Sequence, residues 1–167
     1  HNSYLFKGNV EEDLRMAEPD ATKEEMEAVL QKVNLLGFLQ TQNGLQTELL
    51  EKAGNLSGGQ CQRLVIARAL LRSDSAVYIF DEAASNIDVE SEELIMNVIH
   101  ELAKTKTVLL ISHRLANVVQ SDQIYFLKNG TICERGTHAE LMEQNGAYRH
   151  LYDSQMVLEN YGKEGNA

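Results

Sequence analysis

The sequence has 167 residues, 43% of them hydrophobic, which suffices for one domain with a modest core and is too short for two ordinary domains. Its 25 acidic and 15 basic residues give a formal net charge of -10, which argues against a nucleic-acid surface because phosphate binding needs clustered Lys and Arg. Cys61 and Cys133 are too few for a disulfide framework, and we find no signal peptide and no apolar run of about 20 residues that could cross a bilayer. A reducing, cytosolic setting is therefore expected.

The first third of the chain is predicted to be helical. Glu25 follows Thr22 by three residues, which is the spacing of a capping box at a helix N-terminus. Apolar residues then recur at helical spacing, namely Met26, Val29, Leu30 and Val33. A second helix is expected after the segment Ser57 to Gln60, with one face formed by Leu64, Ala67, Leu70 and Leu71. Ser57 should therefore lie at the start of that helix.

From residue 76 the pattern changes to alternating strands and helices. Residues 76–80 and 106–112 are apolar enough to be buried strands, and residues 89–104 between them have helical spacing. The order strand, helix, strand predicts a parallel sheet. A short helix is expected over 114–120.

The last part of the chain carries strong local signals. Asn129-Gly130 between two strand-like segments predicts a β-hairpin, because this dipeptide readily adopts the positive φ angles of a tight turn. Thr137 and Glu140 form another capping box, and residues 147–159 continue at helical spacing.

The segment Leu56-Ser57-Gly58-Gly59-Gln60 is the first candidate for chemistry. At a helix N-terminus, two glycines and a serine offer backbone N–H groups, a hydroxyl and the positive end of the helix dipole, which together suit a phosphate. Taken alone, such a segment is more often a simple turn.

Polar residues at the ends of the two predicted strands are the second candidate. Asp81 and Glu82 follow the first strand and His113 follows the second, at the carboxyl edge where open α/β sheets bind ligands. A carboxylate there can hold Mg²⁺, its neighbour can deprotonate a water, and an imidazole can contact a phosphoryl group. The alternative for each residue is a solvated strand end or a surface histidine; the ordered set favours the functional interpretation.

These motifs resemble those of the ATP-binding cassette (ABC) ATPases. LSGGQ, VYIFDEAASNID and LLISHRLANV are similar, in order and spacing, to the signature motif, the Walker B strand with its D-loop, and the H-loop. The stretch GTICERGTHAELMEQNGAYRHLYDSQ resembles the C-terminal region of exporter-type members, and Glu51 falls where exporters carry a coupling-loop glutamate. HNSYLFKGNVEEDL resembles the segment that begins at the Q-loop, so the resemblance covers roughly residues 1–157.

The resemblance implies an α/β fold, namely a truncated P-loop NTPase-like domain with a helical subdomain and a partial parallel sheet. Residues 1–72 would form the helical subdomain with the Q-loop remnant and the signature motif. Residues 73–157 would form a partial α/β core, and residues 158–167 a disordered tail. Because the Walker A strand would be missing from the sheet, we expect an exposed apolar face that favours self-association.

The resemblance also implies roles for the candidate residues. In this family two ATPase domains meet head to tail, and the signature motif of one contacts the ATP held by the other. The residues that would contact the partner's ATP are Leu56, Ser57, Gly58, Gly59 and Gln60. Asp81 would serve Mg²⁺, Glu82 would activate water, and His113 would steady the γ-phosphate; Ser85 and Asp88 would lie in the loop that crosses between subunits. The implied partners are a second ABC ATPase domain and a transmembrane permease domain, at the cytoplasmic face of the cell membrane.

The sequence departs from the family pattern in one decisive place. A P-loop reads G-x-x-x-x-G-K-[ST], and the only Gly-Lys pair here, Gly162-Lys163, is followed by Glu164. Without that loop no triphosphate is held against the carboxylates, so we expect the 167 residues alone neither to bind ATP tightly nor to hydrolyse it. His1 stands where the Q-loop glutamine is expected, either as a replacement for it near Mg²⁺ or as a remnant of an artificial boundary.

Smaller departures remove no catalytic group. Ala84 and Asn86 replace the usual threonine and alanine, and Cys61 follows the signature where a polar or basic residue is common. Three functions remain open: an ATPase that powers export, a soluble ABC ATPase of nucleic-acid metabolism, and a degenerate ABC module that only dimerises. The acidic charge and the exporter-like C-terminal stretch argue against the second function, and Glu82 with an intact LSGGQ argues against the third.

Overall fold

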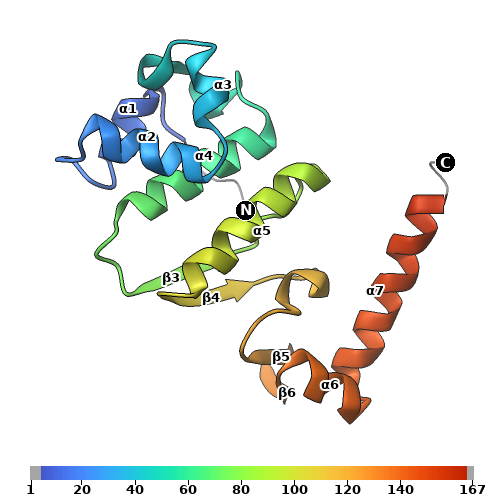
Figure 1. Ribbon diagram of the computed structural model, residues 1–167. Coiled ribbons are helices and arrows are strands. Elements are labelled where there is room, and N and C mark those ends of the chain that lie inside the picture. The colour runs from blue at the N-terminus through green and yellow to red at the C-terminus, as the bar shows by residue number, and fades with distance from the viewer. Residues whose placement is uncertain (1–4, 165–167) are drawn as a thin grey trace. The chain divides into compact units, whose positions relative to one another are not determined.

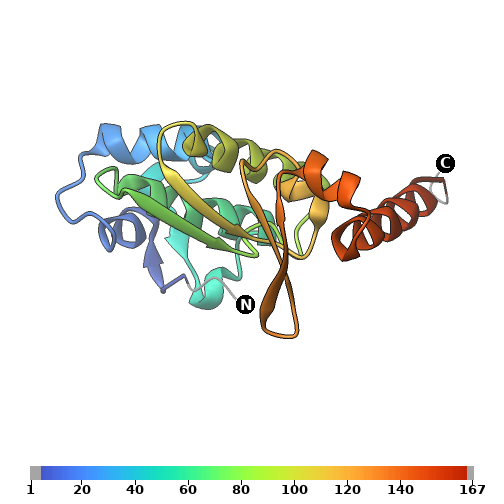
Figure 2. The ribbon, with the colours of Figure 1, turned by 90° about the horizontal axis from the view of Figure 1, so that it is seen from below.

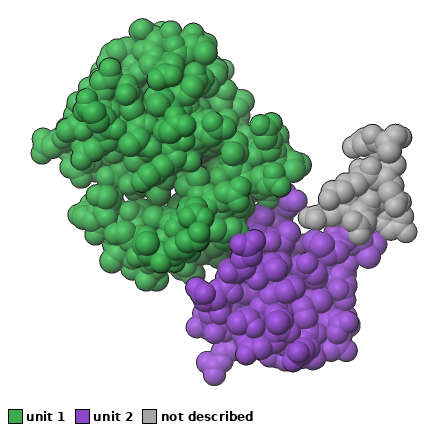
Figure 3. All heavy atoms as spheres, viewed as in Figure 1, with its two compact units in different colours: residues 1–111 green, residues 112–167 purple. Residues whose placement is uncertain are grey.

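The computed structural model describes residues 5–164, apart from the side chains of Lys52 and residues 159–164. The chain divides into two compact units, residues 1–111 and 112–167 (Figure 3). The first unit contains both the predicted helical subdomain and the predicted parallel strands. The predicted boundary between the helical subdomain and the α/β core, at residue 72, therefore does not coincide with the boundary between the compact units. The two predicted subdomains stay a prediction.

The N-terminal part of the first unit is helical, as predicted. Its α-helices are α1 (Val10–Arg15), α2 (Lys23–Lys32), α3 (Leu36–Gln40) and α4 (Gly58–Leu71), and its 3-10 helices are η1 (Gly44–Gln46) and η2 (Glu51–Ala53). The capping box of α2 is confirmed, with the Glu25 N–H donating to Thr22 Oγ1 at 3.2 Å and the Thr22 N–H donating to Glu25 Oε2 at 2.8 Å. The sequence did not predict the two-residue antiparallel pair of β1 (Gly8–Asn9) and β2 (Glu48–Leu49).

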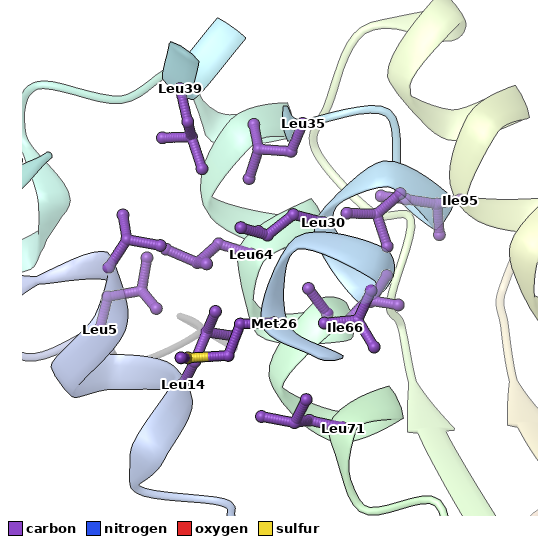
Figure 4. Close-up of a cluster of buried hydrophobic side chains, with 14 of the residues drawn as sticks. Leu5, Leu14, Met26, Leu30, Leu35, Leu39, Leu64, Ile66, Leu71 and Ile95 are labelled. Carbon is purple, nitrogen blue, oxygen red and sulfur yellow. The ribbon is translucent and has the colours of Figure 1, made fainter. Parts of the chain in front are cut away.

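One hydrophobic core holds the helices of the first unit together. Helix α2 packs beside α4 (Figure 1). The labelled side chains of the core come from the segment before α1 and from α1 to α5, and comprise Leu5, Leu14, Met26, Leu30, Leu35, Leu39, Leu64, Ile66, Leu71 and Ile95 (Figure 4). The predicted inward faces of α2 and α4 are buried, except that Leu70 is only half-buried.

The strand–helix–strand unit is also confirmed. Strands β3 (Val77–Asp81) and β4 (Thr107–Ile111) pair in parallel, and α5 (Val89–Ala103) lies against one face of the pair (Figure 2). Tyr78 and Phe80 point to the buried face. The opposite face of the pair is apolar and exposed, with Val77, Ile79, Leu109 and Ile111 between 46% and 65% exposed.

This exposed face, formed by Val77, Ile79, Leu109 and Ile111, confirms the expected apolar surface. In α/β proteins parallel sheets are covered on both faces, because their strands are apolar on both sides. The described residues therefore carry an exposed sheet face of the apolar kind that is normally covered in α/β proteins. Self-association through it stays a prediction.

The second unit contains a hairpin and two helices. Strands β5 (Ile124–Lys128) and β6 (Thr131–Gly136) pair antiparallel around the predicted turn, where Asn129 has φ 52° and Gly130 has φ 77° (Figure 2). Helix α6 (His138–Gln144) begins with the predicted Thr137–Glu140 capping box. The helix predicted over 114–120 is instead the shorter 3-10 helix η3 (Leu115–Val118), whose i→i+3 hydrogen bonds suit a short connector.

Helix α7 (Ala147–Glu164) is anchored at its N-terminus by a residue distant in sequence. The Glu134 carboxylate accepts hydrogen bonds from the Ala147 N–H at 2.6 Å and the Tyr148 N–H at 3.0 Å. A carboxylate at this end of a helix satisfies free N–H groups and interacts favourably with the dipole. The helix continues to Glu164, past the start of the predicted tail at residue 158, and residues 165–167 lie outside the described part.

Candidate functional site

The LSGGQ segment forms the start of α4, as predicted. Ser57 is the N-cap, with its Oγ accepting from the Gln60 N–H at 3.2 Å, while Gln60 Oε1 accepts from the Ser57 N–H at 2.9 Å. This reciprocal capping box was not part of the sequence prediction, although Ser57-x-x-Gln60 is its usual pattern. Leu56 packs against the core, and Ser57 and Gly58 are exposed. The positive end of the α4 dipole is therefore marked by a fixed serine and an exposed glycine.

The two glycines of the segment have different surroundings. A Cβ on Gly59 would lie 2.7 Å from Ser91 Cβ, 3.1 Å from Asp88 Oδ2, and closer still to Ser91 Oγ. A Cβ on Gly58 would meet nothing nearer than 3.9 Å, at the Asn86 oxygen and Ile87 Cγ2. Packing of α4 against the start of α5 therefore requires glycine at Gly59, whereas the fold leaves room for a side chain at Gly58.

The structure brings the LSGGQ segment together with the predicted D-loop. Asp88 is the N-cap of α5, and its Oδ1 accepts from the Ser91 N–H at 2.8 Å. That backbone hydrogen bond is the main reason why the pKa of Asp88 lies below its ordinary value. The sequence placed Asp88 in a crossing loop but did not foresee its cap or its closeness to Gly59.

The differing surroundings of the glycines lead to a matched pair of variants. Gly59→Ala is expected to lower the free energy of unfolding by about 1–3 kcal/mol, because the backbone of α4 must shift to avoid Ser91. Gly58→Ala is expected to change it by less than about 0.5 kcal/mol. Urea unfolding of the 167-residue chain measures both, and Ser91→Gly should recover part of the Gly59→Ala loss. Equal destabilisation by the two glycine variants would contradict this assignment.

The carboxylates Asp81 and Glu82 lie at the carboxyl end of β3, as predicted. Asp81 is the last residue of the strand and is exposed. The Glu82 N–H donates to the Ile111 carbonyl at 2.9 Å, which extends the pairing of β3 with β4 by one residue. Glu82 has φ 51°, in the left-handed region that non-glycine residues rarely adopt. Such backbone strain costs of the order of 1–3 kcal/mol and is concentrated at functional sites.

The loop after Glu82 is tightly folded. The Ser85 N–H donates to the Glu82 carbonyl at 3.0 Å, and Ala83 and Ala84 are buried. Ser85 itself is half-buried. The N–H of Glu82 is therefore held by β4, and its carbonyl is held by the turn that follows.

His113 belongs to the second unit, where it lies two residues before the start of η3. Its side chain is exposed, and its carbonyl accepts from Gln155 Nε2 at 2.8 Å. Gln155, which lies on α7, was not predicted from the sequence to contact this segment. His1, the residue expected at the Q-loop position, lies outside the described residues.

Three further observations concern metal binding, thiol reactivity and membrane spans in the described residues. Within residues 5–164, no cluster of three His, Cys, Asp or Glu side chains could hold a metal ion by itself. Burial raises the pKa of the half-buried Cys61 thiol, which disfavours the reactive thiolate. No helix in the described part of the chain is both long and apolar enough to span a bilayer.

Comparison with known proteins agrees with this arrangement. The family model described as "ABC transporter" matches residues 1–85. The structure of a bacterial Atm1-family ABC exporter with ATP bound superposes with a TM-score of 0.84 at 29% identity, covering 93% of this chain and 27% of that one. The fold and the family match thus define an α/β domain of the ABC ATPase class.

Two curated relatives show the family of the chain more closely. It is 50% identical over its whole length to an uncharacterized ABC transporter ATP-binding protein of Haemophilus influenzae, of which it covers 30%. It is 44% identical over 91% of its length to an ATP-dependent lipid A-core flippase of Mannheimia succiniciproducens, of which it covers 26%. The chain belongs to the ABC transporter family, resembles the ATPase domains of its exporters, and spans between a quarter and a third of the length of these relatives.

Proposed function

We propose that this chain is the signature-motif and Walker B part of the nucleotide-binding domain of an exporter-type ABC transporter. The observation that supports it is the occurrence, in one compact unit, of the Ser57-capped start of α4 and of Asp81 and Glu82 at the end of β3. In the whole protein, ATP hydrolysis would drive transport of a substrate out across the membrane. The partners would be a second ATPase domain and a transmembrane permease, with this domain at the cytoplasmic face.

The residues of the chain fit one side of a nucleotide site. The α4 N-terminus offers its dipole, the Ser57 hydroxyl and the uncovered backbone at Gly58 to a phosphate held by a partner domain. Leu56 and Gln60 support this surface from within, since Leu56 packs into the core and Gln60 closes the capping box. Gly59 allows the close approach of α4 to α5.

The strand-end residues would act on the nucleotide of their own domain. ATP with Mg²⁺ supplies the phosphoryl group and neutralises its charge when bound. Asp81 would hold Mg²⁺ directly or through water, Glu82 would accept the proton of the attacking water, and His113 would contact the γ-phosphate. Ser85 and Asp88, in the loop between β3 and α5, would face the partner domain.

The experiment is ATP turnover by the purified 167-residue chain beside the longer protein that contains it. The sequence contains no G-x-x-x-x-G-K-[ST], so the chain alone is expected to bind ATP weakly and to show no turnover, whereas the longer protein hydrolyses ATP. Turnover by the chain alone that Glu82→Gln abolishes would contradict the predicted inactivity. Absence of turnover in the longer protein would contradict the proposed function itself.

A further inference from the structure

The backbone around His113 is held by a single side chain from the last helix. Gln155, on α7, donates from Nε2 to the His113 carbonyl at 2.8 Å and accepts at Oε1 from the Leu115 N–H at 2.9 Å. The side-chain amide of glutamine offers a donor and an acceptor side by side, which matches the carbonyl and the N–H that it contacts. Both ends of the Gln155 amide are therefore engaged with the segment that carries His113.

A second side chain fixes the same segment from within. Ser112 Oγ accepts from the Arg114 N–H and donates to the Arg114 carbonyl, both at 3.0 Å. Leu115, just beyond, is buried and starts η3. The main chain on both sides of His113 is thus held by side-chain hydrogen bonds, and His113 is an exposed residue.

The start of α7 is attached to its unit by contacts that do not involve Gln155. The helix N-terminus is capped by Glu134 through Ala147 and Tyr148. Tyr148 is buried, and its hydroxyl lies 2.8 Å from His138 Nδ1. These contacts hold the start of α7, whereas the two hydrogen bonds of Gln155 reach His113 and Leu115 from the middle of the helix.

We propose that Gln155 is a positioning residue for His113, setting the direction in which the imidazole leaves the loop. This inference rests on the proposed function, in which His113 contacts the γ-phosphate. Gln155 would touch neither nucleotide nor metal. Its loss should therefore affect the rate of hydrolysis far more than the affinity for ATP.

The test uses the longer protein with Gln155→Glu, which keeps the acceptor but loses the donor, and Gln155→Met, which loses both. Both variants are expected to lower kcat roughly ten- to a hundred-fold, because small displacements of a catalytic group cost that much, with KM for ATP changed less than about two-fold. On a His113→Ala background, Gln155→Glu should cause no further loss. Gln144→Glu, the same change at an exposed position on α6, is the matched control and should leave the rate unchanged.

Amide hydrogen exchange distinguishes a positioning role of Gln155 from a structural tie, that is, a role in holding α7 in place. In the 167-residue chain, Gln155→Met should speed exchange at Leu115 while leaving the protected amides of α7, such as that of Tyr148, unchanged. Exchange that rises throughout α7, or unfolding of α7 in either variant, would overturn the proposal, because Gln155 would then be a structural tie. A wild-type kcat in a folded Gln155→Glu protein, or a further loss on the His113→Ala background, would overturn it as well.

The failure of this inference differs from failure of the proposed function. If the wild-type longer protein hydrolyses no ATP, or if His113→Ala leaves the rate unchanged, the role proposed for His113 is wrong. If His113→Ala lowers the rate and Gln155→Glu does not, only the positioning role is wrong.

Discussion

Glu82→Gln is expected to lower ATP hydrolysis by the longer protein roughly 10²- to 10⁴-fold, because an amide cannot accept the proton of the attacking water. The substitution keeps the shape of the side chain. It also keeps the backbone N–H that donates to the Ile111 carbonyl and the turn that Ser85 closes on the Glu82 carbonyl. ATP binding and the stability of the chain should therefore be almost unchanged.

The measurement is the steady-state rate of phosphate release, with ATP binding measured separately. Glu93→Gln is the matched control, because Glu93 is an exposed glutamate on α5 in the same unit. It should leave the rate unchanged. If Glu82→Gln retained activity within about two-fold of wild type, a role for Glu82 as the general base would be excluded.

Arg68→Met is expected to lower the free energy of unfolding of the chain by about 3–5 kcal/mol, because it leaves a buried carboxylate without its partner. Arg68, on α4, donates from Nη1 to Asp13 Oδ1 on α1 at 2.8 Å. The Asp13 side chain is only 1% exposed, and it also accepts a hydrogen bond from the Phe6 backbone. Asp13 thus links α1 and Phe6 to the helix that begins with the signature motif.

The loss of unfolding free energy in Arg68→Met should depend on pH in a defined direction. Burial raises the pKa of Asp13 above its ordinary value of 3.8, although Arg68 lowers it. The folded state therefore binds the Asp13 proton more tightly than the unfolded state. The contribution of Asp13 to stability falls as pH rises from 3.8 through the folded pKa, and it is constant above that pKa. Removing Arg68 raises the folded pKa further, so the loss is largest at neutral pH and shrinks in acid, where Asp13 is neutral.

Urea unfolding at neutral and at mildly acidic pH measures this effect. The control is the double variant Asp13→Leu with Arg68→Met, which replaces both charges by apolar groups and should lie near the wild-type stability. An Arg68→Met loss that is equal at both pH values would contradict the argument. It would mean that lost packing of the arginine stem, and not an unpaired carboxylate, causes the destabilisation.

Features that depend on neighbouring residues were predictable from the sequence. The capping boxes at Thr22 and Thr137 and the turn at Asn129-Gly130 depend on side chains within four positions, and each formed as expected. The parallel pairing of β3 with β4 followed from the order of elements and from apolar runs too short for helices. The positions of Asp81 and Glu82 at the strand end came with it.

Features that join distant residues were not predictable in this way. The β1–β2 pair has two residues in each strand, too few to produce a pattern. Glu134 lies on β6, and nothing in its sequence neighbourhood indicates that it caps α7. Gln155 looked like a polar residue on a helix, because its partners His113 and Leu115 lie 42 and 40 positions away in sequence.

By itself, the sequence determined the longer helices and strands, the caps at Thr22 and Thr137 and the order of the motifs, because these depend on local spacing and on alternation of apolar and polar residues. Only the tertiary structure separated the two glycines of the signature motif, since it alone shows Gly59 against Ser91 and Gly58 in open space. It alone also showed that the His113 backbone is held from α7. The reason is physical: close approach and hydrogen bonding between distant segments arise when packing of the core brings those segments together.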